Sequence, residues 1–343
     1  MTSTPLVVAL PGAVPPPAEV ADQGVAWHYG DPLREQRELV AGSGAVDLSN
    51  RGVITVTGVD RLSWLDSLTS QVLNPLSAGT SALSLVLSPH GHVEHELHVI
   101  DDGETTYIIT VPGGAPALVK YLDMMRFMLR VEVADVSDQF GVVFEPVREI
   151  AADGAPTWLV PEAYAGLAAP DAGGEVDRFI VERPGALIGR EVVVPRESVA
   201  ERVAASGSPA GTWAYEALRV AAGVPMVGRD TDARTIPHEV GWIGTAVHLA
   251  KGCYRGQETV ARVQNLGRPP RRLTLLHLDG SSDVLPAAGT DVTADGAPVG
   301  VLGTAVQHYE LGPIALATLK MRTATDVVVD VAGSRATQQP IVG

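Results

Sequence analysis

The chain has 343 residues, of which 45% are apolar and 19% are charged, a balance typical of globular proteins with room for two or three domains. Its formal net charge of -15 argues against general affinity for nucleic acid or for anionic membranes, because an acidic surface repels both. The single cysteine excludes an internal disulfide and any zinc or iron–sulfur site built from several cysteines, and it favours a reducing, cytoplasmic compartment.

The first residues do not have the pattern of a targeting signal. Residues 1–23 are interrupted by prolines and lack the basic start of a signal peptide. No uninterrupted apolar run of about 18 residues follows. We therefore expect a flexible N-terminal segment over 1–23 and no segment that spans a membrane.

The next part of the chain, residues 24–264, combines runs of strands with few helices. Helical patterns occupy residues 31–41, 59–73, 115–129 and 214–225. Strand patterns occupy residues 51–58, 82–88, 93–100, 106–111, 130–136 and 140–146. Because strands follow one another instead of alternating with helices, we expect an antiparallel α+β fold. Residues 151–175, rich in alanine, glycine and proline, indicate an irregular connection.

The C-terminal part has a different pattern. Residues 265–272 contain Gly267, Pro269 and Pro270, and are predicted to be a hinge. Short strand patterns separated by glycine, proline and aspartate turns follow, at residues 271–278, 298–306, 314–320 and 326–331. Residues 273–343 are therefore predicted to form a small all-β domain, a barrel.

The segment KGCYRGQETVARV, residues 251–263, contains the only cysteine, Cys253, between two glycines and two cations. Lys251 and Arg255 would lower the pKa of the thiol, and Gly252 and Gly256 allow a close backbone approach or a positive φ. Residues 251–272 hold six basic residues and one acid, a basic island that suits a ligand with carboxylate or phosphate groups. The alternative is an inert buried cysteine beside a solvated basic surface, and the pattern alone leaves both open.

A row of histidines and carboxylates follows the strand pattern at residues 88–100. The i, i+2 spacing puts five of them on one face of an extended strand: His90, His92, Glu94, Glu96 and His98. Such a row can bind a metal. It is more often the wet face of a half-exposed strand, with Val93, Leu97 and Val99 buried behind it, and we predict no metal site.

The loop of residues 228–242 ends in Pro237, His238, Glu239 and Trp242. The carboxylate of Glu239 and the aromatic ring of Trp242 could hydrogen-bond and stack on a planar heterocycle. The alternative is an ordinary long loop.

Taken together, these segments resemble a known family. Residues 28–76, residues 217–242 and the β-rich end resemble, in order and spacing, the aminomethyltransferase (T-protein) of the glycine cleavage system. KGCYRGQETVAR, residues 251–262, resembles more specifically the signature of the YgfZ family, T-protein relatives that bind folate and assist iron–sulfur enzymes. The resemblance covers the chain from about residue 24 onward.

The resemblance implies a folate-binding α+β body over 24–264, with two interleaved antiparallel lobes around a central opening, followed by the C-terminal β-barrel. It also implies tetrahydrofolate or a folate derivative as cofactor, and [4Fe-4S] enzymes or their assembly proteins as partners. Cys253 is then the functional residue. The expected cofactor-binding residues are Lys251, Gly252, Tyr254, Arg255, Gly256, Gln257, Glu258 and Arg262, joined by Glu239 and Trp242 of the preceding loop.

One departure from the T-protein pattern separates the two relatives. The paired aspartates of the T-protein are matched here by His95 and Glu96, and the glutamate of its LRLEAG helix is matched by Ala221. Loss of a buried carboxylate where a reactive ring nitrogen should be oriented argues against aminomethyl transfer. We therefore expect an accessory protein for the maturation or repair of [4Fe-4S] enzymes, and leave open whether the chain is itself an enzyme. A folate-dependent aminomethyltransferase is the alternative, and a module that docks RNA or protein through the basic island is a weaker one.

Overall fold

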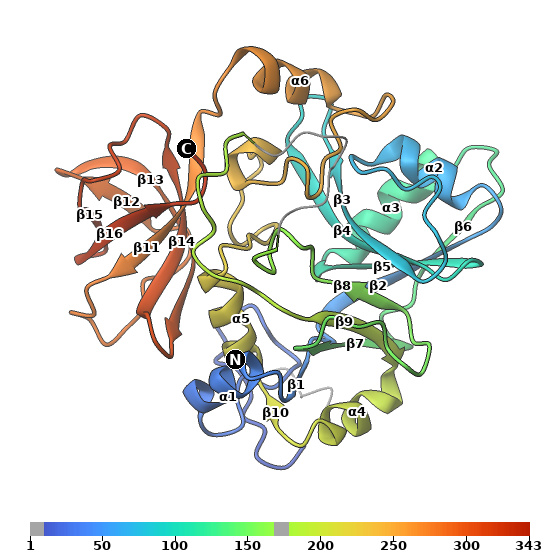
Figure 1. The fold of residues 1–343 in the computed structure, drawn as a ribbon, viewed down its shortest axis with the longest axis horizontal. Coiled ribbons are helices and arrows are strands. Elements are labelled where there is room, and N and C mark those ends of the chain that lie inside the picture. Colours follow the sequence, from blue (N-terminus) through green and yellow to red (C-terminus); the bar gives the residue numbers. More distant parts are fainter. Residues whose placement is uncertain (1–9, 168–177) are drawn as a thin grey trace. The chain divides into compact units, whose positions relative to one another are not determined.

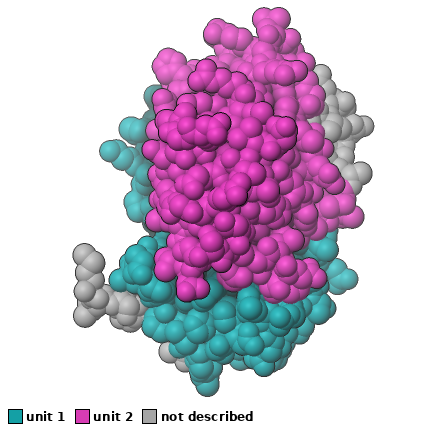
Figure 2. Space-filling view, turned by 90° about the vertical axis from the view of Figure 1, so that its left-hand side faces the viewer, with its two compact units in different colours: residues 1–84, 95–161, 188–215 teal, residues 85–94, 162–187, 216–343 magenta. Residues whose placement is uncertain are grey.

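The computed structural model describes residues 10–167 and 178–343. The chain divides into two compact units, each assembled from discontinuous segments (Figure 2). Figure 1 labels the helices and strands of the chain. Unit 1 comprises residues 1–84, 95–161 and 188–215, and unit 2 comprises residues 85–94, 162–187 and 216–343. Part of the flexible segment expected at 1–23, and part of the connection expected at 151–175, lie outside the described residues.

Unit 1 contains most of a five-stranded sheet, here called sheet C. Its strands lie in the order β3 (Thr80–Leu87), β4 (Val93–Asp101), β5 (Thr105–Pro112), β2 (Arg51–Thr57) and β6 (Glu132–Asp135). Helix α3 (Ala115–Met125) contacts β2, β5 and β6, and buries Leu118 and Leu122. Helix α2 (Arg61–Leu68) buries Trp64 and Leu65. The tip of the β3–β4 hairpin, residues 85–94, belongs to unit 2.

Unit 1 also contains a second five-stranded sheet, here called sheet B. Its strands lie in the order β10 (Pro209–Ala210), β1 (Ala45–Asp47), β7 (Phe140–Glu145), β9 (Arg190–Pro195) and β8 (Thr157–Leu159). Helix α4 (Val199–Ala205) contacts β1 and β7, and its Val199 and Val203 join the valines of β7 and β9 in one core. The strands β7 and β9 are buried on both faces, which explains their nearly continuous apolar sequences. Helix α1 (Pro32–Val40) contacts β10.

Unit 2 contains a closed barrel. Its strands lie in the order β11 (Arg271–Leu278), β14 (Gly312–Lys320), β13 (Ala297–His308), β12 (Asp291–Ala294), β15 (Val329–Val331) and β16 (Ser334–Pro340). Closure pairs β11 with β16 and so leaves no edge strand. The interior is filled by Leu276, Leu302 and Leu319 with smaller apolar residues. Unit 2 also contains the 3₁₀ helix η2 (Pro237–Val240) and helix α6 (Gln257–Leu266), and α5 (Thr212–Ala221) crosses the division between the units.

The α+β class and the C-terminal β-barrel predicted from the sequence are confirmed. The predicted domain boundaries and the hinge at 265–272 stay predictions. Four predicted helices and the strand runs are present, but α2 is shorter than expected, because the backbone turns extended at Thr69. The sequence patterns missed β1, β9, β10, β12, β16, α4 and α6, and also β8, which lies within the connection expected at 151–175. No helix in the described parts of the chain is both long and apolar enough to cross a membrane.

Candidate functional site

The Cys253 loop alternates buried and exposed residues. Lys251 and Tyr254 are each 8% exposed, whereas Gly252 and Cys253 face solvent. The Lys251 Nζ lies 5.7 Å from the centre of the Tyr254 ring. Burial raises the pKa of Tyr254 to about 12, so its phenol stays protonated at neutral pH. Two buried side chains thus anchor a loop that presents its thiol to solvent.

Gly256, which follows this loop, lies close to the tip of the β3–β4 hairpin within unit 2. Gly256 has φ +84°, and a Cβ built on it would lie 2.6 Å from the Ser88 carbonyl oxygen and 2.9 Å from the Gly91 Cα. A Cβ on Gly91 would lie 2.7 Å from the Thr259 Cβ. The backbone around Gly256 therefore packs on the tip of the β3–β4 hairpin, which explains both glycines. Gly252 has open space around it and no such constraint.

The basic island of residues 251–272 is largely engaged by the protein itself. Arg255 forms an ion pair with Glu94, with 3.0 Å between Nη1 and Oε2. Arg271 binds Asp232 and Glu239, and Arg272 donates to the carbonyl oxygens of the turn after β14. Arg262, on α6, is exposed and forms no ion pair or hydrogen bond with the described residues. The basic residues that are neighbours in the sequence thus bind different partners in the structure and do not form one cluster.

Helix α6 begins immediately after Gly256, where the sequence patterns indicated no helix. Gln257 and Glu258 form its first turn and Arg262 its middle. At its end, the Arg178 Nη2 donates to the carbonyl oxygens of Val263 (3.5 Å) and Gly267 (3.3 Å). Such capping satisfies carbonyl groups that have no partner within the helix. The roles of Gln257, Glu258 and Arg262 in ligand binding stay predictions.

The loop residues Glu239 and Trp242 both lie in the interior. The Glu239 carboxylate accepts hydrogen bonds from Arg271 Nε (2.8 Å) and Nη2 (2.7 Å), and from the Ile236 N–H (3.1 Å). Trp242 is fully buried, and its indole N–H has no hydrogen-bond partner among the described residues. A buried N–H without a partner is rare, and a ligand is one way to satisfy it. Their roles toward a cofactor stay predictions.

Sequence analysis named His238 in this loop but assigned it no role. It is fully buried in η2 and its ring meets Phe179 edge-on, with 5.6 Å between centroids. Burial lowers the pKa of His238 to about 4, so the imidazole is neutral at pH 7. Its position after Pro237 in a polar loop was visible in the sequence, but its burial was not.

We predicted that one face of β4 is exposed to solvent, and this prediction is wrong from Glu96 onward. Glu96 and His98 are buried, along with Leu97 and Val99 on the opposite face. His98 lies between two carboxylates, with its Nε2 3.2 Å from Glu96 Oε1 and its Nδ1 2.8 Å from an oxygen of Glu191. The strand packs on both faces because sheet B supplies this partner. No group of three or more histidine, cysteine, aspartate or glutamate residues suited to a metal occurs among the described residues.

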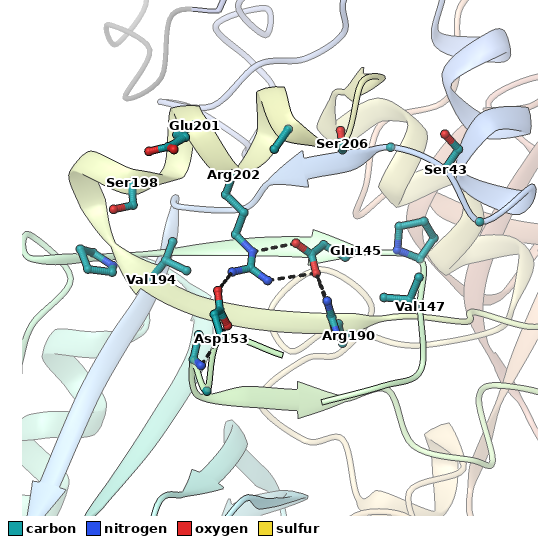
Figure 3. Close-up of a pocket in the computed structure, with 17 residues that line it drawn as sticks. Ser43, Glu145, Val147, Asp153, Arg190, Val194, Ser198, Glu201, Arg202 and Ser206 are labelled. Carbon is teal, nitrogen blue, oxygen red and sulfur yellow. Dashed lines mark hydrogen bonds and ion pairs between the residues drawn. The ribbon is translucent and has the colours of Figure 1, made fainter. Parts of the chain in front are cut away.

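A groove in unit 1 contains none of the predicted site residues. It has a volume of about 830 Å³ and lies between the loop at Gly42, the turn at Asp153 and helix α4. Figure 3 shows that Glu145 accepts hydrogen bonds from both Arg190 (2.7 Å) and Arg202 (2.7 Å), and that Asp153 accepts a second one from Arg202. Because both guanidinium groups are occupied by carboxylates, these ion pairs hold the loops together.

Comparison with known proteins bears on the family. Residues 22–144 match the family described as GCVT N-terminal domain. An aminomethyltransferase of Geobacillus kaustophilus is 29% identical over 88% of this chain and 87% of its own length. An aminomethyltransferase of Nostoc sp. is 26% identical over 85% and 80%. The glycine cleavage system aminomethyltransferase T from Bartonella henselae has the same fold, with a TM-score of 0.72, 18% identity, and coverage of 95% of this chain and 92% of that chain.

These matches agree with the T-protein resemblance and do not separate the YgfZ family from the aminomethyltransferases. The aminomethyltransferase family uses tetrahydrofolate, the cofactor expected from the sequence. Residues 22–144 match the GCVT N-terminal domain, and the chain as a whole is similar to aminomethyltransferases in sequence and to the Bartonella henselae protein in fold.

Proposed function

We propose that this protein binds tetrahydrofolate and acts in the maturation or repair of [4Fe-4S] enzymes through Cys253. The observation that carries the proposal is the Cys253 loop itself. Its thiol is exposed, while Lys251 and Tyr254 beside it are buried and Gly256 is packed against the hairpin tip. A thiol held outward by an ordered loop is suited to act on a partner. We also propose a reducing, cytoplasmic compartment, in which a single exposed thiol stays reduced.

The described residues of unit 2 fit a folate. The unpartnered indole N–H of Trp242 can donate to a heterocycle, and the exposed guanidinium of Arg262 can bind an anionic tail. Bound tetrahydrofolate would supply a carrier for one-carbon groups. We propose that the residues of the Cys253 loop and of α6 contribute to its binding, with Glu239 holding Arg271 in place.

The experiment is complementation of a deletion strain. Cys253→Ala should leave the activity of [4Fe-4S] enzymes as low as in the deletion strain, and Val284→Ala, at an exposed position of the C-terminal part of the chain, should restore that activity. Calorimetric titration of both variants with tetrahydrofolate should show unchanged affinity, which separates the pocket from the thiol. Full complementation by Cys253→Ala would show that the thiol is not required for this function.

A second candidate is a folate-dependent aminomethyltransferase or another one-carbon transferase. It is favoured by the buried carboxylate of Glu96, which lies where the T-protein pattern has an acid, and by relatives named aminomethyltransferase. This candidate predicts 5,10-methylenetetrahydrofolate from a lipoyl-bound aminomethyl donor and tetrahydrofolate. If the purified protein forms none, the glycine-cleavage version is rejected.

A further inference from the structure

A groove in unit 2 lies where the barrel strand β11 begins and its neighbour β14 ends. The two strands pair antiparallel, and their register places Arg271 opposite Lys320. The Met321 N–H also donates to the Pro270 carbonyl oxygen at 2.9 Å. This pairing brings together two short segments that are distant in the sequence. The groove at their junction has a volume of about 520 Å³ and is lined by Arg268, Pro269, Pro270, Lys320, Met321 and Arg322.

The three cations of this groove have no carboxylate partner among the described residues. Arg268 and Arg322 are exposed, and neither forms an ion pair or hydrogen bond with the described part of the chain. The Lys320 ammonium donates one hydrogen bond, of 2.6 Å, to the Pro298 carbonyl oxygen, which leaves further N–H groups for another acceptor. The groove therefore carries three positive charges on a chain whose formal net charge is -15.

A fourth cation holds the turn that carries Arg322. Arg272 is 3% exposed, and it donates from Nη1 to the Met321 carbonyl oxygen at 2.8 Å and from Nη2 to the Thr323 carbonyl oxygen at 2.7 Å. Its Nη2 also lies 3.2 Å from the Gln338 Oε1, so its partners among the described residues are neutral oxygens. A buried charge that no carboxylate neutralises adds to the positive potential around the turn.

The grouping of these cations differs from the one that the sequence presents. Arg271, the neighbour of Arg272, is bound by Asp232 and Glu239. Arg268 instead shares a groove with Lys320 and Arg322, which lie outside the basic island of residues 251–272. Single exposed cations are ordinarily solvated. Several cations of one sign that line one groove concentrate the positive potential there and attract an anion.

Charge and size together decide the class of anion. A phosphate monoester carries about −1.5 to −2 charges at neutral pH, so two linked phosphates supply about −3 and match the three cations in a small volume. A carboxylate supplies one charge, and a peptide with three of them adds a backbone that takes up much of the groove. The volume of about 520 Å³ is within the roughly 300–1,000 Å³ of small-molecule sites.

We propose that the groove between Arg268 and Arg322 binds a small molecule through a diphosphate group. The planar guanidinium groups bind phosphate oxygens in pairs, and the Lys320 ammonium adds a point charge. The apolar surface of Pro269, Pro270 and Met321 contacts the rest of the molecule. No bond is made or broken. The site goes beyond the proposed folate function and does not depend on it, because none of its residues is among those proposed for folate.

The test is calorimetric titration of the full chain with pyrophosphate. Pyrophosphate should bind at one site per chain, and more tightly than inorganic phosphate or citrate. Arg268→Gln and Arg322→Gln should each weaken the binding about tenfold, as expected for the loss of one hydrogen bond between charged groups. Arg335→Gln, at another exposed arginine of the barrel, is the matched control and should bind pyrophosphate as the unmodified protein does.

The absence of pyrophosphate binding, or binding that Arg268→Gln and Arg322→Gln both leave unchanged, overturns the proposal. Citrate that binds as tightly as pyrophosphate would show a general attraction of anions. A hexaglutamate peptide that binds more tightly would show a docking site for an acidic protein segment, and either result overturns the diphosphate site.

Two further measurements keep the result interpretable. The urea midpoint of each variant should equal that of the unmodified protein, because Arg268 and Arg322 are exposed; if one variant has a lower midpoint, the other decides. Tetrahydrofolate affinity should be the same in all three variants. Failure of the diphosphate site and failure of the folate function are thereby distinguished.

Discussion

Replacing Gly256 by alanine should detach the Cys253 loop from the hairpin tip without touching the thiol. The left-handed φ of +84° costs an L residue about 1–2 kcal/mol. The new Cβ would also lie 2.6 Å from the Ser88 carbonyl oxygen and 2.9 Å from the Gly91 Cα, two backbone atoms that cannot rotate away. Strain and overlap together should cost about 3 kcal/mol, within the range of overpacked and strained sites.

Cys253 makes this measurable, because it is the only cysteine and takes a spin label at one site. In Gly256→Ala the label should become more mobile by electron paramagnetic resonance, and the urea midpoint of unfolding should fall. Gly252→Ala is the matched control, because its Cβ would meet no heavy atom within 4 Å. The same label mobility and the same midpoint in both variants would refute the reasoning.

Three further predictions concern stability. Burial lowers the pKa of His238 to about 4, so below about pH 6.5 this imidazole binds fewer protons in the folded state than in the unfolded state. The free energy of unfolding should therefore fall as pH falls. In urea unfolding, His238→Gln should reduce the loss of stability between pH 7 and pH 5 by about 2 kcal/mol. Leu276→Ala, in the barrel interior, should lower the free energy of unfolding by about 2–5 kcal/mol. Val301→Ala, at a residue that is 45% exposed, should change it by less than about 0.5 kcal/mol. Equal effects of the two substitutions would contradict the burial of Leu276 in the barrel core. Arg219→Met should cost about 3–5 kcal/mol in thermal or urea unfolding, because two buried carboxylates lose their shared cation, and an unchanged midpoint would show that they do not depend on it.

Local structure was predictable where neighbours in the chain decide it. The Asp31 carboxylate accepts a hydrogen bond of 3.0 Å from the Arg34 N–H, as its place before a helical pattern with Pro32 in the first turn indicates. The strand runs of sheet C and the turn-rich barrel followed from residue alternation and from glycine and proline spacing. Helix α6 was missed, because two glycines and a cluster of charges precede it and its apolar residues are few.

The candidate site was predictable as a segment but not as an arrangement. Sequence pattern singled out Cys253, and the structure shows that its thiol is exposed. It also suggested that Arg255 acts on the thiol, whereas the guanidinium of Arg255 lies on Glu94. Gly256 was expected to admit a ligand or a positive φ. It has the positive φ, and the close approach is to the protein's own hairpin.

The sequence by itself determined the α+β class, the C-terminal barrel, the T-protein resemblance and the segment that bears the thiol, because periodicity, turn residues and motif spacing are properties of neighbouring residues. Tertiary structure alone decided which charges neutralise one another. Arg51 and Glu191 are 140 positions apart, and His98 and Glu191 are 93 apart. Such pairs form only when the fold brings strands of the two sheets together, and burial then makes each charge depend on its partner. Glu96 and His98, two members of a row of polar residues that the sequence presents as a solvent-exposed face, are thus part of a buried cluster of charges.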